Sequence, residues 1–323
     1  MSESSNPVAS FVKGFFSYLD GKRIEAAVLH GWLNDFEGEL SDVDFVIETP
    51  ALSRIAGLIE SYCSAVGWRL CQVLRHETTA AFCVCSAMDD PSCAVALDAC
   101  SDYQRNDTFF LSAEFLLNDR MALPWGGFRL SDTAELCYRF AKAAAKAKDP
   151  ITAAAEFSVY PEESRCACAT WLEKQWAITL ASWDVPSLTL ALAQLRAKSN
   201  RRPSLLHAGT LTRILSRILT PTGLVVITGH EDYDTSATRL EQVFGHLYFR
   251  RTLKAAHWQP GMLKDLISTT LIVLPEIGTV WEKIIPADCI YRLEPTQDGG
   301  TQCREIAEHL HERCKLCESR RNI

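Results

Sequence analysis

The sequence predicts a mixed α/β fold, and three features of the chain carry that prediction. Over residues 8–125, short apolar runs of strand length alternate with segments of helical periodicity. From about residue 130 to 218 the pattern is helical throughout, and the apolar run 224–228 then opens another α/β segment. At 323 residues the chain exceeds the usual span of one hydrophobic core, so we expect more than one domain.

The strands of the first segment are predicted from short apolar runs. Between the second and third of them, apolar residues recur at helical spacing from Leu52 to Tyr62 and predict an amphipathic helix. The predicted strands cover residues 25–30, 41–48, 69–74, 80–86 and 94–99.

The middle segment contains Ala-rich helical stretches such as 140–148. Asp149-Pro150 interrupts it, and Pro161 and Pro203 predict later breaks. A turn at 221–223 leads into the last predicted strand. We therefore expect three domains: a mixed α/β domain, a helical connector and a small α/β domain, covering residues 1–128, 129–219 and 220–323.

Charge and composition exclude several classes of protein. The formal net charge of -7 argues against a broad nucleic-acid-binding face, which requires clustered Lys and Arg. No apolar run reaches the ~20 residues that a membrane-spanning helix needs, so we expect no membrane insertion. The first residues lack the basic and apolar parts of a signal peptide, which predicts a cytoplasmic location.

The 13 cysteines are scattered through the chain, and we interpret them as reduced, buried thiols. The tail 309–317 contains a His-x-His and a Cys-x-x-Cys motif. On one continuous helix these groups cannot all converge on a tetrahedral zinc ion, so we expect no metal site there.

Two acids interrupt an apolar run at Ser41-Asp42-Val43-Asp44-Phe45-Val46-Ile47. In a strand, Asp42 and Asp44 share one face, and the alternate apolar residues point into the core. Adjacent carboxylates need neutralisation, and hard oxygen ligands suit Mg²⁺. Asp98 ends another apolar run and would join them if its strand lies alongside. Three carboxylates can hold one or two magnesium ions against a nucleotide's phosphates. A solvent-facing strand with incidental acids is the alternative.

Other polar residues carry two interpretations each. His30 precedes Gly31 at a strand end, and we interpret it as a structural residue. Arg75 and His76 either belong to a solvated strand turn or are functional, with Arg75 as a phosphate ligand and His76 as an acid or base. Lys142 and Lys146 share a helix face, where they either meet a triphosphate or solvate an Ala-rich helix.

The order strand, Gly31, Ser41-Asp42-Val43-Asp44 and then Asp98 resembles the polymerase-β-like nucleotidyltransferase superfamily. The resemblance implies that Asp42, Asp44 and Asp98 are catalytic metal ligands, with Asp98 also assisting as a base. It implies a nucleotide near Gly31, Trp32 and Ser41, with Lys142 and Lys146 as further nucleotide-binding candidates. Trp32 replaces the small residue that is usual after the Gly.

With an aromatic residue after the Gly, the motif resembles that of a subfamily encoded with surface-polysaccharide genes. In that subfamily a helical connector and then a thymidylate-kinase-like P-loop domain follow the nucleotidyltransferase-like half. Residues 221–229 resemble the strand that leads into such a P-loop. The loop that follows, 229–237, lacks the Lys-Ser/Thr pair and carries three acids, so we expect a degenerate domain that does not bind ATP.

The sequence thus favours a magnesium-dependent nucleotidyltransferase that acts on an NTP and an unidentified acceptor, a sugar or sugar phosphate in the setting that the resemblance implies. Two alternatives stay open. One is a catalytically inactive nucleotide-binding or scaffold protein, and the other is a residual nucleotide kinase that depends on Ser236.

Overall fold

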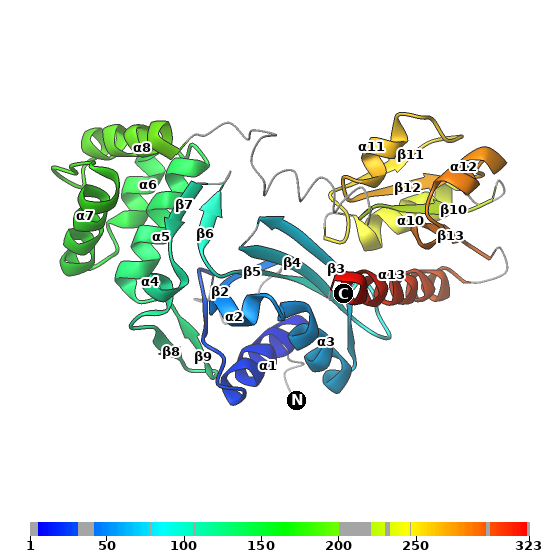
Figure 1. Cartoon of the computed structure of the whole chain (residues 1–323), viewed down its shortest axis with the longest axis horizontal. Helices are drawn as coiled ribbons and strands as arrows, with labels where there is room; N and C mark the ends of the chain where they lie inside the picture. The colour runs from blue at the N-terminus through cyan, green and yellow to red at the C-terminus, as the bar shows by residue number, and fades with distance from the viewer. Residues whose placement is uncertain are drawn as a thin grey trace.

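The computed structural model describes residues 6–31, 42–77, 79–105, 108–199, 221–229, 233–245, 247–294 and 298–321. These residues form two sheets with helices packed against them, and a separate two-stranded hairpin, β6 (Tyr103–Arg105) with β7 (Thr108–Leu111) (Figure 1). The fold is therefore mixed α/β, as the sequence predicts.

The larger sheet has seven strands in the order β3-β4-β5-β2-β1-β9-β8. Strand β2 pairs with β5 in parallel, as β1 does with β9, and the other neighbours are antiparallel. All five strands predicted in this segment are present, although β1 is only three residues long. The strands are Ala26–Val28 (β1), Asp42–Ile47 (β2), Trp68–Glu77 (β3), Ala80–Ala87 (β4), Ala94–Cys100 (β5), Met121–Leu123 (β8) and Gly127–Arg129 (β9).

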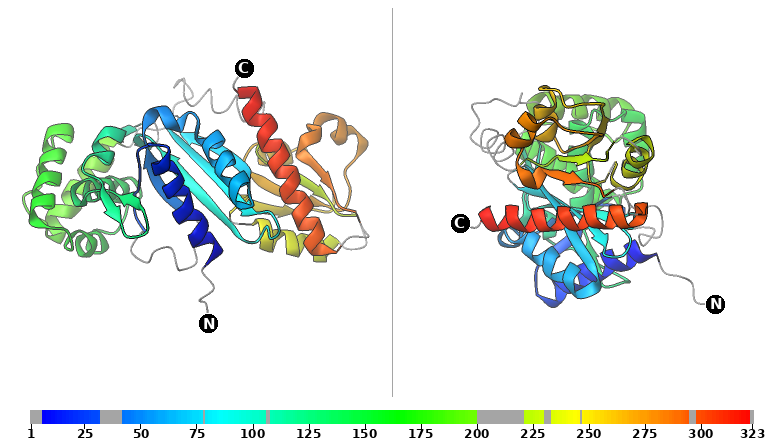
Figure 2. Two further views of the ribbon diagram at one scale, coloured as in Figure 1. Left: turned by 90° about the horizontal axis from the view of Figure 1, so that it is seen from below. Right: turned by 90° about the vertical axis from the view of Figure 1, so that its right-hand side faces the viewer.

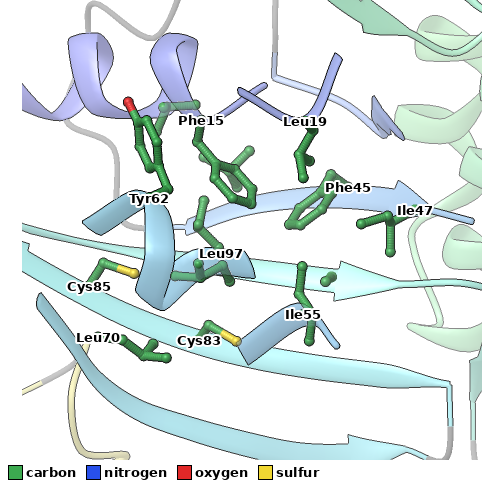
Figure 3. Packing of buried hydrophobic residues seen from close by; sticks show 14 of the residues in the cluster. Phe15, Leu19, Phe45, Ile47, Ile55, Tyr62, Leu70, Cys83, Cys85 and Leu97 are labelled. Carbon is green, nitrogen blue, oxygen red and sulfur yellow. The ribbon is translucent and has the colours of Figure 1, made fainter. Parts of the chain in front are cut away.

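One face of this sheet is covered by α1 (Pro7–Gly21), α2 (Thr49–Leu52) and α3 (Ile55–Val66). Side chains at four-residue spacing on α1, such as Phe15 and Leu19, pack on Phe45 and Leu97 of the sheet (Figure 3). The helix predicted over 52–62 is interrupted after α2, and α3 ends where Gly67 takes the left-handed conformation, with φ of 74°.

Five helices on the opposite side share a second core with Ala27 and Val46. Asp149 caps α6 and Pro150 is its first residue, and Pro161 caps α7, so both prolines mark helix starts where the sequence predicts breaks. Pro203 lies outside the described residues. The helices are α4 (Ala113–Leu117), α5 (Asp132–Ala145), α6 (Pro150–Phe157), α7 (Glu162–Trp176) and α8 (Val185–Ser199).

The smaller sheet is entirely parallel, with the order β11-β12-β10-β13. Its strands are Leu224–Ile227 (β10), Arg251–Lys254 (β11), Thr270–Leu274 (β12) and Ile290–Arg292 (β13). Its helices are α10 (Tyr233–Phe244), α11 (Met262–Leu266), α12 (Thr279–Ile284) and α13 (Gly299–Arg321), with a 3-10 turn at Ala287–Cys289. None of the helices in the described ranges is long and apolar enough to cross a bilayer.

The C-terminal helix α13 lies along strand β3 of the larger sheet and joins the two halves of the molecule (Figure 2). His311 lies with its Nδ1 2.9 Å from the carbonyl oxygen of Leu70. The buried Arg313 donates to the carbonyl oxygens of Pro221 and Gly223, just before β10. These contacts bind both sheets to one helix, and the predicted division into three domains stays a prediction.

The two halves also share buried surface on the face of the larger sheet that carries Asp44. Phe82 and Val84 of β4 pack in one core with residues of α10 and α13. Val46, on the same face, belongs instead to the core beneath α5. The acid-bearing face is therefore covered by helices of the middle segment around Val46 and by the C-terminal half around Val84.

All thirteen cysteines are free thiols, and most of them are buried. Burial raises the pKa of thiols such as Cys71 and Cys83 above the ordinary value. The interpretation of the cysteines as buried thiols holds for most of them, whereas Cys166 is exposed.

Phe45 is the most direct test of the core that supports the acid-bearing strand. Its ring is fully buried and packs edge-on against Phe15 and Phe16, with ring centroids 6.0 and 5.4 Å away. We expect Phe45→Ala to lower the free energy of unfolding by about 3–5 kcal/mol in urea denaturation followed by circular dichroism. Phe109, which is 42% exposed, is the matched control. Equal losses from Phe45→Ala and Phe109→Ala would contradict this account.

Candidate functional site

The parallel pairing of β2 with β5 brings the three predicted acids to one face of the sheet. Asp44 is the direct register partner of Asp98, and Asp42 is the partner of Ala96. Neighbouring strands lie about 4.8 Å apart, and side chains two residues apart on a strand share a face. Whether Asp98 lies near the other two acids depends on strand order, and the structure places its strand beside β2. Asp42, Asp44 and Asp98 therefore project from two adjacent strands toward the same side.

These acids line a pocket of about 360 Å³ between the sheet and α5. Both lysines predicted from the sequence, Lys142 and Lys146, stand in its wall. The pocket is completed by residues of the β5–β6 segment and by others from β1, β4 and α5: Leu29, Ala80, Cys100, Asp102, Tyr103, Gln104, Arg105 and Tyr138. A wall of carboxylates therefore faces a wall of cations across a space large enough for a small ligand.

Asp44 is at the centre of the polar contacts in this pocket. Its Oδ2 lies 2.8 Å from Nζ of Lys142 and 2.7 Å from Nε2 of His30. Burial works to raise the pKa of the Asp44 carboxyl, but the hydrogen bond from His30 and the charge and hydrogen bond of Lys142 outweigh it. The pKa is held well below its ordinary value, so Asp44 is an anion at neutral pH.

Helix α5 begins at the N-cap Ser131, whose side chain accepts from the backbone N–H of Ala134. One face of the helix packs in the core, and the opposite face carries the lysines that line the pocket. Small and aromatic residues such as Ala141 and Phe140 pack in the core, whereas Lys142 and Lys146 lie one turn apart on the pocket side. Nζ of Lys142 also donates to the hydroxyl oxygen of Tyr138 at 3.0 Å. Burial raises the pKa of Tyr138 well above its usual range, so its hydroxyl keeps its proton.

Lys146 is more exposed than Lys142, and no hydrogen bond or ion pair of its ammonium is found among the residues that the structure describes. Partial burial lowers the pKa of Lys146, and the positive charges of Lys142 and Arg105 lower it further. Cations thus crowd this wall, and an anionic ligand would relieve their repulsion.

The glycine of the predicted motif, Gly31, lies three residues beyond the end of β1. Gly31 has a φ of 82°, a conformation that a side chain strains, which explains why a glycine stands at this position. The other two nucleotide-binding candidates of the motif, Trp32 and Ser41, lie outside the described residues.

His30 and Tyr138 belong to the site although sequence reasoning did not place them there. The antiparallel register of β1 and β2 sets Leu29, not His30, opposite Asp44, and the backbone N–H of Leu29 donates to the carbonyl oxygen of Asp44. His30 follows beyond the end of β1, and its side chain reaches Oδ2 of Asp44 there. The signal available in the sequence was the position of His30 immediately before Gly31. Tyr138 precedes Lys142 by one helical turn, so the helix period could have found it.

Several other sequence candidates lie elsewhere. Arg75 pairs with Glu318 of α13 at 3.4 Å and does not line this pocket. On α13, His309 contacts the carbonyl oxygen of Asp288 and His311 that of Leu70. These two histidines thus point to different partners.

The carboxylates fit magnesium in their chemistry. They are hard oxygen donors that line one pocket with room for water and phosphate oxygens, as Mg²⁺ requires. Within the described ranges, no three His, Cys, Asp or Glu side chains are grouped closely enough to hold an ion as they stand. The ammonium of Lys142 is the cation now on Asp44, so a metal ion there would have to replace it.

Comparison of the chain with protein-family models, with curated proteins and with solved structures finds no match. The chemistry of the pocket therefore has to be argued from its own residues.

The pair of Asp44 and Lys142 is testable by a double-mutant cycle with Asp44→Asn and Lys142→Met. Because both side chains are mostly buried, 17% and 22% exposed, we expect a coupling free energy of about 1–2 kcal/mol in urea unfolding at pH 7. The folded-state pKa of Asp44 is depressed, so this stabilisation is present above the ordinary carboxyl pKa of about 4 and is lost as pH falls further.

The matched control is the same cycle with Lys146→Met, for which we expect a coupling below about 0.5 kcal/mol. Equal couplings for the two lysines would show that Asp44 responds to general charge rather than to its contact with Lys142.

Proposed function

We propose that this protein is a magnesium-dependent nucleotidyltransferase. The single observation that carries the proposal is the register of Asp44 with Asp98 on parallel strands, with Asp42 on the same face and two lysines across the pocket. Carboxylates that can hold a divalent ion and cations that can bind phosphates, on opposite walls of one pocket, suit the recognition of a metal–nucleotide complex.

The proposed reaction is attack by an acceptor oxygen on the α-phosphorus of an NTP. A bond forms between that oxygen and the α-phosphorus, and the bond from the α-phosphorus to the bridging oxygen breaks. Pyrophosphate leaves with the electron pair, and the acceptor loses its proton. Positioning and charge neutralisation dominate such transfers.

The side chains divide these tasks. Asp42, Asp44 and Asp98 would hold magnesium, and Asp98 would also accept the proton of the acceptor. Bound magnesium would neutralise phosphate charge and favour ionisation of the attacking oxygen. Lys142 and Lys146 would bind phosphate oxygens, including those of the leaving pyrophosphate. Gly31 would allow the backbone to approach the phosphates closely.

Resemblance of the motif to the polymerase-β-like superfamily agrees with this assignment, and resemblance to its surface-polysaccharide subfamily suggests a sugar or sugar phosphate as acceptor. Asp102, Gln104 and Arg105, which follow β5, line the same pocket and offer it both hydrogen-bonding and charged groups. A hydroxyl-rich or phosphorylated acceptor suits such a surface.

A residual kinase is the weaker interpretation of the C-terminal half. Strand β10 and helix α10 flank residues 228–232 as a P-loop would be flanked, and His230, Glu231 and Asp232 lie outside the described residues. Ser236, the hydroxyl on which kinase activity would depend, is only 6% exposed on α10. We propose instead that this half serves packing, since α13 and β4 share its core.

A catalytically inactive nucleotide-binding protein is the second candidate, and the ion pair of Lys142 with Asp44 favours it, because that pair satisfies the carboxylate without any metal. A transferase and a binding protein differ in whether a bound NTP is converted to products. Release of pyrophosphate from an NTP that depends on Asp98 identifies a transferase, whereas nucleotide binding without release identifies a binding protein.

Calorimetric titration with each NTP in the presence of Mg²⁺ tests the proposal. We expect binding by the wild type and a loss of affinity of at least roughly 10–100-fold in Asp42→Asn/Asp44→Asn, the range that removal of even outer partners of a metal ligand causes. Ser236→Ala should bind as the wild type does. Binding that survives the double substitution but fails in Ser236→Ala would overturn the proposal in favour of a kinase site.

A further inference from the structure

A second lobe adjoins the acid-lined pocket on the far side of Lys142. This basic lobe encloses about 420 Å³ and shares Lys142 and Lys146 with the first pocket. Four cationic side chains, one carboxylate, one imidazole and one small apolar residue line it: Arg139, Lys142, Lys146, Lys148, Glu156, His30 and Ala143. Lys142 therefore stands at the boundary between a lobe rich in carboxylates and a lobe rich in cations.

The end of helix α5 builds the basic lobe. Ala147 takes a left-handed conformation, with φ of 56°, and the backbone N–H of Lys148 turns back to donate to the carbonyl oxygen of Ala143 at 3.0 Å. A left-handed non-glycine residue is strained, so the surrounding structure holds this turn in place. The small side chain of Ala143 leaves the lobe open, and the turn brings Lys148 to the same side as Lys142 and Lys146.

Two of the cations in the lobe are anchored by partners within the protein. Arg139 lies 2.8 Å from the buried carboxylate of Glu135, and Lys148 pairs with Glu156. Lys142 instead reaches across to the acidic lobe. Its flexible four-carbon stem allows the ammonium to move between the two lobes without a change in the helix.

Lys142 contacts His30, which lines the basic lobe, as well as Asp44 of the acidic lobe, and the two contacts made by Nε2 of His30 cannot both be hydrogen bonds. Nζ of Lys142 lies 2.5 Å from Nε2 of His30, and that same Nε2 lies 2.7 Å from Oδ2 of Asp44. One Nε2 atom cannot accept from Lys142 and donate to Asp44 at the same time, so only one of the two contacts is a true hydrogen bond. Withdrawal of Lys142 would let His30 donate to Asp44 without a competing cation.

We propose that Lys142 is an exchangeable cation that excludes free divalent metal from Asp44 and yields to a metal–polyphosphate complex. Phosphate oxygens in the basic lobe draw the ammonium away from Asp44, and the metal of the incoming complex takes its place. This inference rests on the proposed function, since it assumes that Asp44 binds the metal of a nucleotide. It specifies that metal and nucleotide bind together rather than in sequence.

The charges set the direction of this exchange. An ammonium in contact with a carboxylate and a divalent ion compete for the same oxygen, and the two positive charges repel each other strongly at such a distance. Free metal thus meets a filled site. A polyphosphate offers the ammonium a replacement anion, so metal and polyphosphate each raise the affinity for the other.

Titration with Mn²⁺ alone, followed by the electron paramagnetic resonance signal of the free ion, tests the exchange. We expect Lys142→Met to bind Mn²⁺ about tenfold or more tightly than the wild type, because the competing charge is gone. Lys142→Gln provides a polar second variant, and circular dichroism confirms that each variant is folded. Lys146→Met is the matched control, since it removes a cation from both lobes without touching Asp44; its Mn²⁺ affinity should change by less than about threefold.

Three results would overturn the inference: equal Mn²⁺ affinity in the wild type and both Lys142 variants, an equal gain in Lys146→Met, or no measurable Mn²⁺ binding by any folded variant. None of these decides the proposed function, which fails if nucleotide binding proves independent of Asp42 and Asp44 or if a bound NTP releases no pyrophosphate. If the wild type binds free Mn²⁺ as tightly as the Lys142 variants do, the proposed transferase activity still stands, but Lys142 does not exclude metal from Asp44.

Discussion

The parallel pairing of β2 with β5 is the constraint on which the candidate site depends. It sets Asp44 beside Asp98 on one face of the sheet, where two adjacent carboxylates repel each other unless a cation lies between or beside them. The protein meets that need with Lys142, whose ammonium contacts Asp44 directly. The pKa of Asp44 is depressed because its contacts with His30 and Lys142 favour the charged carboxylate by more than burial disfavours it.

Two groups of helices cover parts of the sheet face that carries the acids, and the pocket lies on this same face. Helix α5 and its neighbours cover the sheet around Val46, and the C-terminal half covers it around Val84. The pocket that holds the acids is lined by residues between Leu29 and Lys146, so its walls come from the sheet, the β5–β6 segment and α5. Helix α13, along β3, ties the C-terminal half to the same sheet (Figure 2).

Much of this arrangement follows from local sequence patterns, and the remainder depends on tertiary pairing. The alternation of Asp42 and Asp44 with Val43 and Phe45 predicts the strand and its two faces, and the four-residue spacing predicts that Lys142 and Lys146 share a helix face. No local pattern specifies which strand lies beside β2, so the meeting of Asp98 with Asp44 requires the structure. The contact of His30 with Asp44 likewise requires the structure, because it joins the residues that follow β1 to a neighbouring strand.

The central claim is that the three carboxylates and the cations of α5 form one metal–nucleotide site. A crystal structure of the protein with Mn²⁺ and an α,β-methylene NTP, analysed by anomalous scattering, tests it most directly. The account predicts a Mn²⁺ peak about 2.1–2.2 Å from carboxylate oxygens of Asp42, Asp44 or Asp98, with phosphates extending toward Lys142 and Lys146. A nucleotide bound beside residues 229–237, with no Mn²⁺ at the three acids, would contradict it.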